Sequence, residues 1–290
     1  MGDLPYEKVN IQWYPGHMAK SRRMIEENIS MVDAVCEILD ARIPMASRNP
    51  DIRTLAGGKP RLVILNRCDL ADEAVTAEWK AAFEKENAAV LLTDAKSGKG
   101  ISGFAPAVRK LLAEKISAYE SRGQAGRTLR CMILGIPNVG KSTFINKVAG
   151  RKAAVAENRP GVTRGKQWIN LGNGLELLDT PGLLWPRFES QEVGELLAIT
   201  GAIKQEVFDT EALASNLILR LGTLYPDALQ ARYKLEPMPE ANGYELLEAA
   251  AKKRGFLISR GEADTARMAG TLLREVHEGK LGRISLEKPE

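Results

Sequence analysis

Short runs of apolar residues alternate with amphipathic segments through the first half of the chain. The apolar runs cover residues 34–39, 61–65, 89–92 and 129–134. Continuous apolar runs of this length are typical of strands that are buried on both faces of a parallel sheet. The pattern therefore predicts four parallel strands.

The segments between these runs have the spacing of amphipathic helices. Residues 71–86 place Trp79 and Phe83 four positions apart, and residues 103–120 repeat apolar side chains at helical intervals. Strands that alternate with helices predict an α/β fold, with a mostly parallel sheet and helices on both faces.

The second half of the chain adds a hairpin and then only helical patterns. The hairpin pairs residues 167–171 with 175–178 around a Gly-Asn-Gly turn. We predict a first domain over residues 1–187, with an N-terminal arm over residues 1–20, and a small all-α domain over residues 188–290. The helices expected in the second domain cover residues 193–209, 210–222, 243–255 and 264–278.

Composition excludes several classes of protein. No apolar run approaches the roughly 18 residues that span a bilayer, and the N-terminus lacks the features of a signal or transit peptide. We therefore expect a cytoplasmic protein without a membrane segment. Its three cysteines are too widely spaced for a disulfide framework or a metal cluster. The net charge of +4 comes from the first two thirds of the chain, which is a weak sign of RNA binding.

Residues 135–142 read GIPNVGKS, which has the Gly-x-x-x-x-Gly-Lys-Ser spacing of a phosphate-binding loop. A predicted strand precedes the loop and a helical pattern over residues 141–149 follows it. Backbone N–H groups of such a loop bind phosphates at the N-terminus of the helix. Lys141 would bridge the β- and γ-phosphates, and Ser142 would ligate Mg²⁺. The nucleotide contacts expected here are Pro137, Asn138, Val139, Gly140, Lys141, Ser142 and Thr143.

Two further segments fit the γ-phosphate side of such a site. Asp179-Thr180-Pro181-Gly182 follows a predicted strand, so Asp179 could hold Mg²⁺ through water and the Gly182 N–H could meet the γ-phosphate. The polar loop between the two motifs contains Thr163, a candidate Mg²⁺ ligand when the triphosphate is present. A loop of this kind becomes ordered with the triphosphate and loosens after hydrolysis.

Two earlier strands end in residues that suit a guanine base. Asp69, in Asn66-Arg67-Cys68-Asp69, can accept two hydrogen bonds that guanine donates and adenine cannot. Asn66 would fix this loop, although Asn and Asp are also ordinary turn residues. After the next strand come Asp94 and Ala95, and the Ala95 N–H would reach the guanine carbonyl oxygen.

The base-binding segments therefore precede the phosphate-binding segments, which reverses the usual order. A ligand at the carboxyl ends of neighbouring strands does not depend on chain order. On its motifs, the sequence resembles the circularly permuted GTPases. These motifs cover residues 13–20, 39–44, 47–50, 135–142, 160–163 and 179–182.

The resemblance implies a GTP-hydrolysing factor that acts late in assembly of the large ribosomal subunit. It implies binding of GTP or GDP with Mg²⁺, and contact of the helical domain with the subunit precursor and its rRNA. We expect a monomer. Leu183 stands where many GTPases have a water-positioning glutamine, so the resemblance assigns His17 to catalysis beside Lys141, and Asn138 to a K⁺ ion. The alternative for His17 is an exposed histidine in an N-terminal arm.

The sequence leaves alternatives in the loops around the base, in the function and in the RNA contacts. Arg67 and Asp94 replace the lysine and serine that the family has at these positions, which changes the loops on either side of the base. The alternative functions are a GTP-gated RNA-binding module and a permuted GTPase of another RNA particle, such as the small subunit. The basic residues considered for RNA contact are Lys20, Arg22, Arg23, Arg42, Arg48, Lys252, Lys253 and Arg254.

Overall fold

The structure is a computed structural model, and it describes residues 18–150, 167–185, 188, 190–203, 207–236, 238 and 240–289. The described residues form two compact units. The described residues between 18 and 185 and those from 287 to 289 belong to one, here called the α/β unit, and the described residues between 188 and 286 form the other, the helical unit. The division differs from the predicted one at the C-terminal end, where residues 287–289 belong to the α/β unit.

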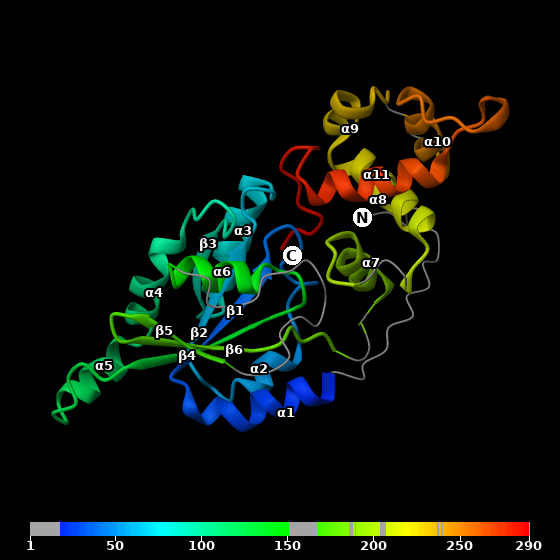
Figure 1. Ribbon diagram of the computed structural model, residues 1–290. Coiled ribbons are helices and arrows are strands. Elements are labelled where there is room, and N and C mark those ends of the chain that lie inside the picture. The colour runs from blue at the N-terminus through cyan, green and yellow to red at the C-terminus, as the bar shows by residue number, and fades with distance from the viewer. Residues whose placement is uncertain are drawn as a thin grey trace. The chain divides into compact units, whose positions relative to one another are not determined.

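A six-stranded sheet forms the centre of the α/β unit (Figure 1). The strand order is β3-β2-β1-β4-β6-β5, and every neighbouring pair is parallel except β5 and β6. The strands are β1 (Ala34–Asp40), β2 (Arg61–Asn66), β3 (Ala89–Thr93), β4 (Leu129–Gly135), β5 (Gln167–Gly172) and β6 (Leu175–Asp179). All four predicted parallel strands and the hairpin are therefore confirmed.

The sheet order places segments that are distant in the sequence next to each other. β1 pairs directly with β4, so Ile38 lies opposite Gly135 at the start of the phosphate loop. β2 lies on the other side of β1 and ends at Asn66. Because the carboxyl ends of parallel strands share one edge of a sheet, the base-binding and phosphate-binding segments meet there.

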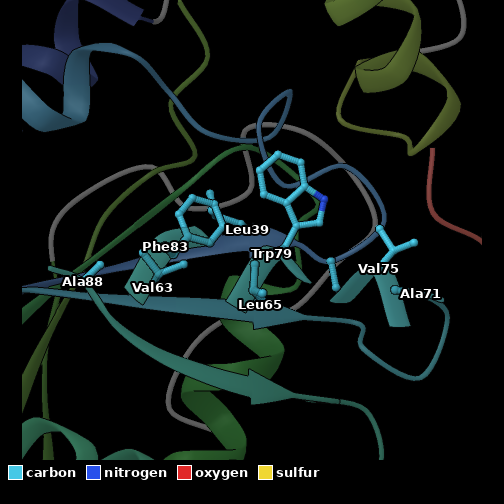
Figure 2. Close-up of a cluster of buried hydrophobic side chains, with 9 residues drawn as sticks. Leu39, Val63, Leu65, Ala71, Val75, Trp79, Phe83 and Ala88 are labelled. Carbon is cyan, nitrogen blue, oxygen red and sulfur yellow. The ribbon is translucent and has the colours of Figure 1, made fainter. Parts of the chain in front are cut away.

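Helices cover both faces of the sheet (Figure 1), as the sequence predicts. On one face, Trp79 and Phe83 stack with ring centroids 5.6 Å apart and pack against Leu39, Val63 and Leu65 (Figure 2). Alternate strand residues point to the opposite face. The helices of this unit are α1 (Met18–Asn28), α2 (Asp51–Leu55), α3 (Glu73–Lys85), α4 (Phe104–Leu111), α5 (Ala113–Glu120) and α6 (Lys141–Val148), with short 3₁₀ turns η1 (Ile29–Met31) and η2 (Ile101–Gly103).

In the helical unit, α8 packs against every other helix. Its residues from Ala212 to Leu221 are all buried, which is typical of a central helix. No helix among the described residues of either unit is long and apolar enough to cross a membrane. The helices are α7 (Gln191–Ile199), α8 (Thr210–Leu224), α9 (Pro226–Tyr233), α10 (Gly243–Lys253) and α11 (Thr265–His277), with the turn η4 (Ser259–Gly261).

Some predicted helix boundaries are wrong. The segment 103–120 is two helices, because the chain bends at Leu112, which stays buried while α5 has no buried residue. The helix predicted over 193–209 ends at Ile199, where Gly201 has a positive φ of 81°. The sequence analysis also missed α2 and α9. Helix α9 begins with Pro226. A proline can interrupt a helix, but it also fits the first turn of one.

One buried acid lies in the sheet without a close partner. Glu37 of β1 is fully buried, and neither of its carboxyl oxygens has a hydrogen-bond partner within the described residues. Arg48 is its nearest cation, with Nε 4.0 Å from Oε2. Burial raises the pKa of Glu37 from 4.5 to about 7; Arg48 and Arg61 oppose the shift and Glu86 adds to it.

We predict that Glu37→Gln removes a pH dependence of stability. The folded protein binds this proton more tightly than the unfolded chain, so the Glu37 contribution is complete below pH 4.5 and is lost as the pH rises through about 7. The loss should be on the order of 3 kcal/mol. Urea unfolding from pH 5 to pH 8 measures it: the free energy of unfolding of Glu37→Gln should change less than that of the unaltered protein. Parallel profiles would contradict the prediction.

Candidate nucleotide-binding site

The phosphate loop connects β4 to α6 at the carboxyl edge of the sheet. Asn138 and Gly140 have left-handed backbone conformations, with φ of 58° and 96°. A Cβ atom on residue 140 would lie only 2.4 Å from the amide nitrogen of Asn66, so the close approach requires glycine. Helix α6 begins at Lys141, and its first backbone N–H groups have no acceptor within the helix. The loop therefore has the geometry of an anion-binding site.

The segment after β6 packs directly on this loop. Thr180 Oγ1 donates to the Ile133 carbonyl at 2.7 Å, and the Leu183 N–H donates to the Gly135 carbonyl at 3.1 Å. A Cβ atom on Gly182 would lie 2.8 Å from the Pro137 nitrogen. The structure thus brings the two predicted phosphate-side motifs into backbone contact.

Lys141 and Asp179 face each other where the two segments meet. Their Nζ and Oδ1 atoms are 3.4 Å apart, and their side chains are only 7% and 2% exposed. Burial lowers the pKa of Lys141, and the Asp179 carboxylate opposes the shift. Ser142 and Thr143 are half-buried in the next two positions. The arrangement combines a buried cation with hydroxyl and carboxylate oxygens, which suits a phosphate with a hard divalent cation.

Asn66 joins the base side of the site to the phosphate side. Its Nδ2 donates to the Val139 carbonyl in the phosphate loop at 2.9 Å. Its Oδ1 accepts from Thr93 Oγ1 at 3.1 Å and from the Ala95 N–H at 3.0 Å. The side chain is 2% exposed, so these bonds are shielded from water.

Arg67 makes a second link to the phosphate loop. Its backbone is left-handed, with φ of 62°, and Nη2 donates to the Asn138 carbonyl. Nη1 lies 3.5 Å from Asp40 Oδ2. A lysine could not offer two donors in this planar arrangement, so the departure from the family pattern has a structural role here.

Asp40, at the end of β1, is held by Arg42. The guanidinium donates from Nε to Oδ1 at 2.9 Å and from Nη2 to Oδ2 at 2.7 Å, and both side chains are buried. Burial alone would raise the pKa of Asp40, but Arg42 and then Arg67 outweigh it and lower the pKa to about 2. The sequence analysis noticed this Asp-x-Arg motif only as a family feature. An acid and an arginine two apart at a strand end were the available signal.

On the base side, Asp94 stabilises its own loop. Its Oδ1 accepts from the N–H groups of Lys96 at 2.9 Å and Ser97 at 3.2 Å, so it takes the place of a serine hydroxyl. The Ala95 N–H, expected to face guanine, donates to Asn66 in this structure, so a bond to guanine would have to share it. Asp69 is half-buried in the adjacent loop after β2.

Two predicted site residues, His17 and Thr163, lie outside the described residues. Among the basic residues considered for RNA, Arg42 is fully buried, and Arg48 pairs with Glu86 and lies 5.3 Å over Phe83. We therefore correct these two: they bind other side chains of the protein.

Arg254 keeps 31% of its side chain exposed, so its contact with RNA stays a prediction. It lies 3.4 Å from Glu275 and over the ring of Phe256. Arg23, Lys252 and Lys253 are exposed.

Comparisons with known proteins agree with this geometry. Residues 130–219 match the family model described as 50S ribosome-binding GTPase. The chain is 44% identical over 280 residues to the ribosome biogenesis GTPase A of Bacillus licheniformis, which covers 97% of this chain and 99% of the relative. It is 33% identical to the ribosome biogenesis GTPase A of Thermotoga maritima, over 97% of this chain and 95% of that one.

Solved structures give the same result for the fold. The GDP-bound structure of TM YlqF matches with a TM-score of 0.65 and 29% identity, over 91% of this chain and 98% of the other. The GNP-bound YlqF from T. maritima matches with a TM-score of 0.64, over 93% and 99%. The predicted fold, a circularly permuted P-loop GTPase domain followed by helices, is confirmed.

We predict that Asn66→Ala weakens guanine nucleotide binding at least tenfold and lowers the free energy of unfolding by about 2–4 kcal/mol, because it leaves buried donors and acceptors unpaired. Thr93→Val is the matched control, since it removes only the Thr93 Oγ1 bond and keeps the contact to Val139. Calorimetric titration with GDP and urea unfolding measure both effects. Equal nucleotide affinities of the two variants would show that the link to the phosphate loop is unimportant.

Proposed function

Because the chain belongs to the ribosome biogenesis GTPase A family, we propose that it acts on the large ribosomal subunit late in assembly. The protein is a GTPase of ribosome biogenesis. The nucleotide-binding part of the proposal is supported by the meeting of the phosphate loop, the segment after β6 and the Asn66 loop at one edge of the sheet. The large subunit is favoured because the matching family model is described as 50S ribosome-binding.

Guanine nucleotide and Mg²⁺ fit the residues present. We assign Asp69 to the two donors of the guanine edge, with Asn66, Arg67, Asp94 and Ala95 forming its surroundings. The phosphates belong on the loop from Pro137 to Thr143 and on the Gly182 N–H. Ser142, Asp179 and Thr163 supply the oxygen ligands that Mg²⁺ prefers. In this assignment the ammonium of Lys141 moves from its contact with Asp179 to the phosphates.

Hydrolysis requires a group that positions water. Leu183, after Gly182, is 4% exposed and apolar, and its N–H is bonded to Gly135, so it cannot do this. We assign the role to His17, whose imidazole can accept a proton or stabilise charge near neutral pH. Lys141 stabilises charge on the transferred phosphoryl group.

The helical unit is our candidate for rRNA contact, with the protein acting as a cytoplasmic monomer. Lys252 and Lys253 are exposed at the end of α10, and Lys252 forms an ion pair with Glu248. Binding there would add a salt-dependent affinity for phosphates. A GTP-gated RNA-binding module and a factor for the small subunit are the competing functions.

We predict that purified large subunits raise the rate of GTP hydrolysis at least tenfold and that small subunits do not. His17→Ala should abolish the stimulated rate while GDP affinity stays within twofold, because the nucleotide contacts are elsewhere. Phosphate release with each subunit measures the rate, and calorimetry measures the affinity. Stimulation by small subunits alone would contradict the proposal, and an unaltered turnover of His17→Ala would favour the binding module.

We further propose that Asn138 helps to bind a K⁺ ion that stabilises charge in the transition state. Its position within the phosphate loop and the oxygen of its amide support this. Hydrolysis should be about tenfold faster in KCl than in NaCl at equal ionic strength. Asn138→Gly keeps the left-handed backbone and should lose the difference between the two salts. A variant that still responds to K⁺ would exclude Asn138 as a ligand.

A further inference from the structure

The last residues of the α/β unit bind a loop far from them in sequence. The Glu287 carboxylate accepts from the Met45 N–H at 2.8 Å and from the Ala46 N–H at 2.9 Å. The Glu287 carbonyl accepts from Trp79 Nε1 at 3.3 Å. Two successive backbone N–H groups that face a carboxylate form charge-assisted bonds, which are stronger than bonds between neutral groups.

The loop that Glu287 binds starts at Asp40. Within it, Ser47 Oγ accepts from the Asp40 N–H at 3.0 Å, and the Arg42 guanidinium forms its two bonds to the Asp40 carboxylate. Met45 and Ala46 lie between these two contacts in sequence. Fixing their backbone therefore fixes the loop that carries Arg42 and Ser47.

Asp40 in turn connects this loop to the nucleotide site. Its Oδ2 lies 3.5 Å from Arg67 Nη1, and Arg67 Nη2 donates to the carbonyl of Asn138 in the phosphate loop. The same arginine precedes the base-binding Asp69 by two positions. Glu287 is thus connected to both sides of the candidate site by its bonds to Met45 and Ala46, by the backbone of their loop, and by the polar contacts of Asp40 and Arg67.

We infer that Glu287 is a positioning residue for guanine nucleotide binding, acting through the Asp40–Arg67 pair. Its contacts described above, to Met45, Ala46 and Trp79, lie outside the candidate nucleotide site. Loss of its carboxylate frees the loop, weakens the hold of Arg42 on Asp40, and lets Arg67 leave the Asn138 carbonyl. The inference rests on guanine nucleotide occupying the site proposed above.

The test uses the full chain without ribosomal particles. Glu287→Gln keeps the shape but removes the charge, and Glu287→Ala removes the side chain. We expect GDP affinity to fall about fivefold for the first and about tenfold for the second, with faster GDP dissociation. For GTP hydrolysis, KM should rise by the same factors and kcat at saturating GTP should stay within twofold, a split that general destabilisation would not give. Glu84→Gln, the same charge change at an exposed position of α3, should match the unaltered protein.

A double-mutant cycle tests the route through Arg67. If Glu287 acts through Arg67, adding Glu287→Ala to Arg67→Ala should change GDP affinity by less than twofold. A tenfold effect in both backgrounds would overturn the route, and unchanged affinity of Glu287→Ala in the unaltered background would overturn the inference. These results are independent of the ribosome, so a failure to respond to large subunits would count against the proposed function and not against the role of Glu287.

Discussion

The buried amide of Asn66 is the contact on which the nucleotide site depends. It binds a carbonyl of the phosphate loop with one end, and a hydroxyl and an N–H group of the base side with the other. In a site shielded from water, each of these polar groups would be costly to leave unpaired. Asn66 and Val139 are 73 residues apart in the sequence, so this noncovalent link sets the spacing of the two halves of the site where the chain does not.

A second feature of the site is the group of charged side chains around Asp40. Asp40 has two arginine partners: buried Arg42 binds it through two hydrogen bonds, and the partly exposed Arg67 makes one contact at 3.5 Å. Burying the Asp40–Arg42 pair costs desolvation, which the bidentate geometry helps to offset. The contacts of Arg67 explain why it can stand in the base motif. Its planar guanidinium contacts Asp40 through Nη1 and the Asn138 carbonyl through Nη2. A lysine ammonium has no such pair of separate donor nitrogens.

Much of the fold was predictable because its strands are buried on both faces. Such strands give continuous apolar runs, and all four were found within one residue of their ends. The bend at Leu112 was not visible, because it depends on where the helix leaves the core and not on the local pattern. The candidate site likewise contains residues that sequence motifs reveal and contacts that they do not. Asn66, Lys141 and Asp179 stand in recognisable motifs, whereas the contact of Glu287 with Met45 and Ala46 joins residues whose types give no local signal.

The placement of residues 287–289 in the α/β unit has a consequence for truncation of the protein at its C-terminus. After the helices, the last described residues return to the α/β unit, so that unit is built from two separate stretches of the chain. A chain that ended at residue 286 would keep every described helix of the helical unit. The α/β unit, which holds the candidate nucleotide site, would lose residues 287–289.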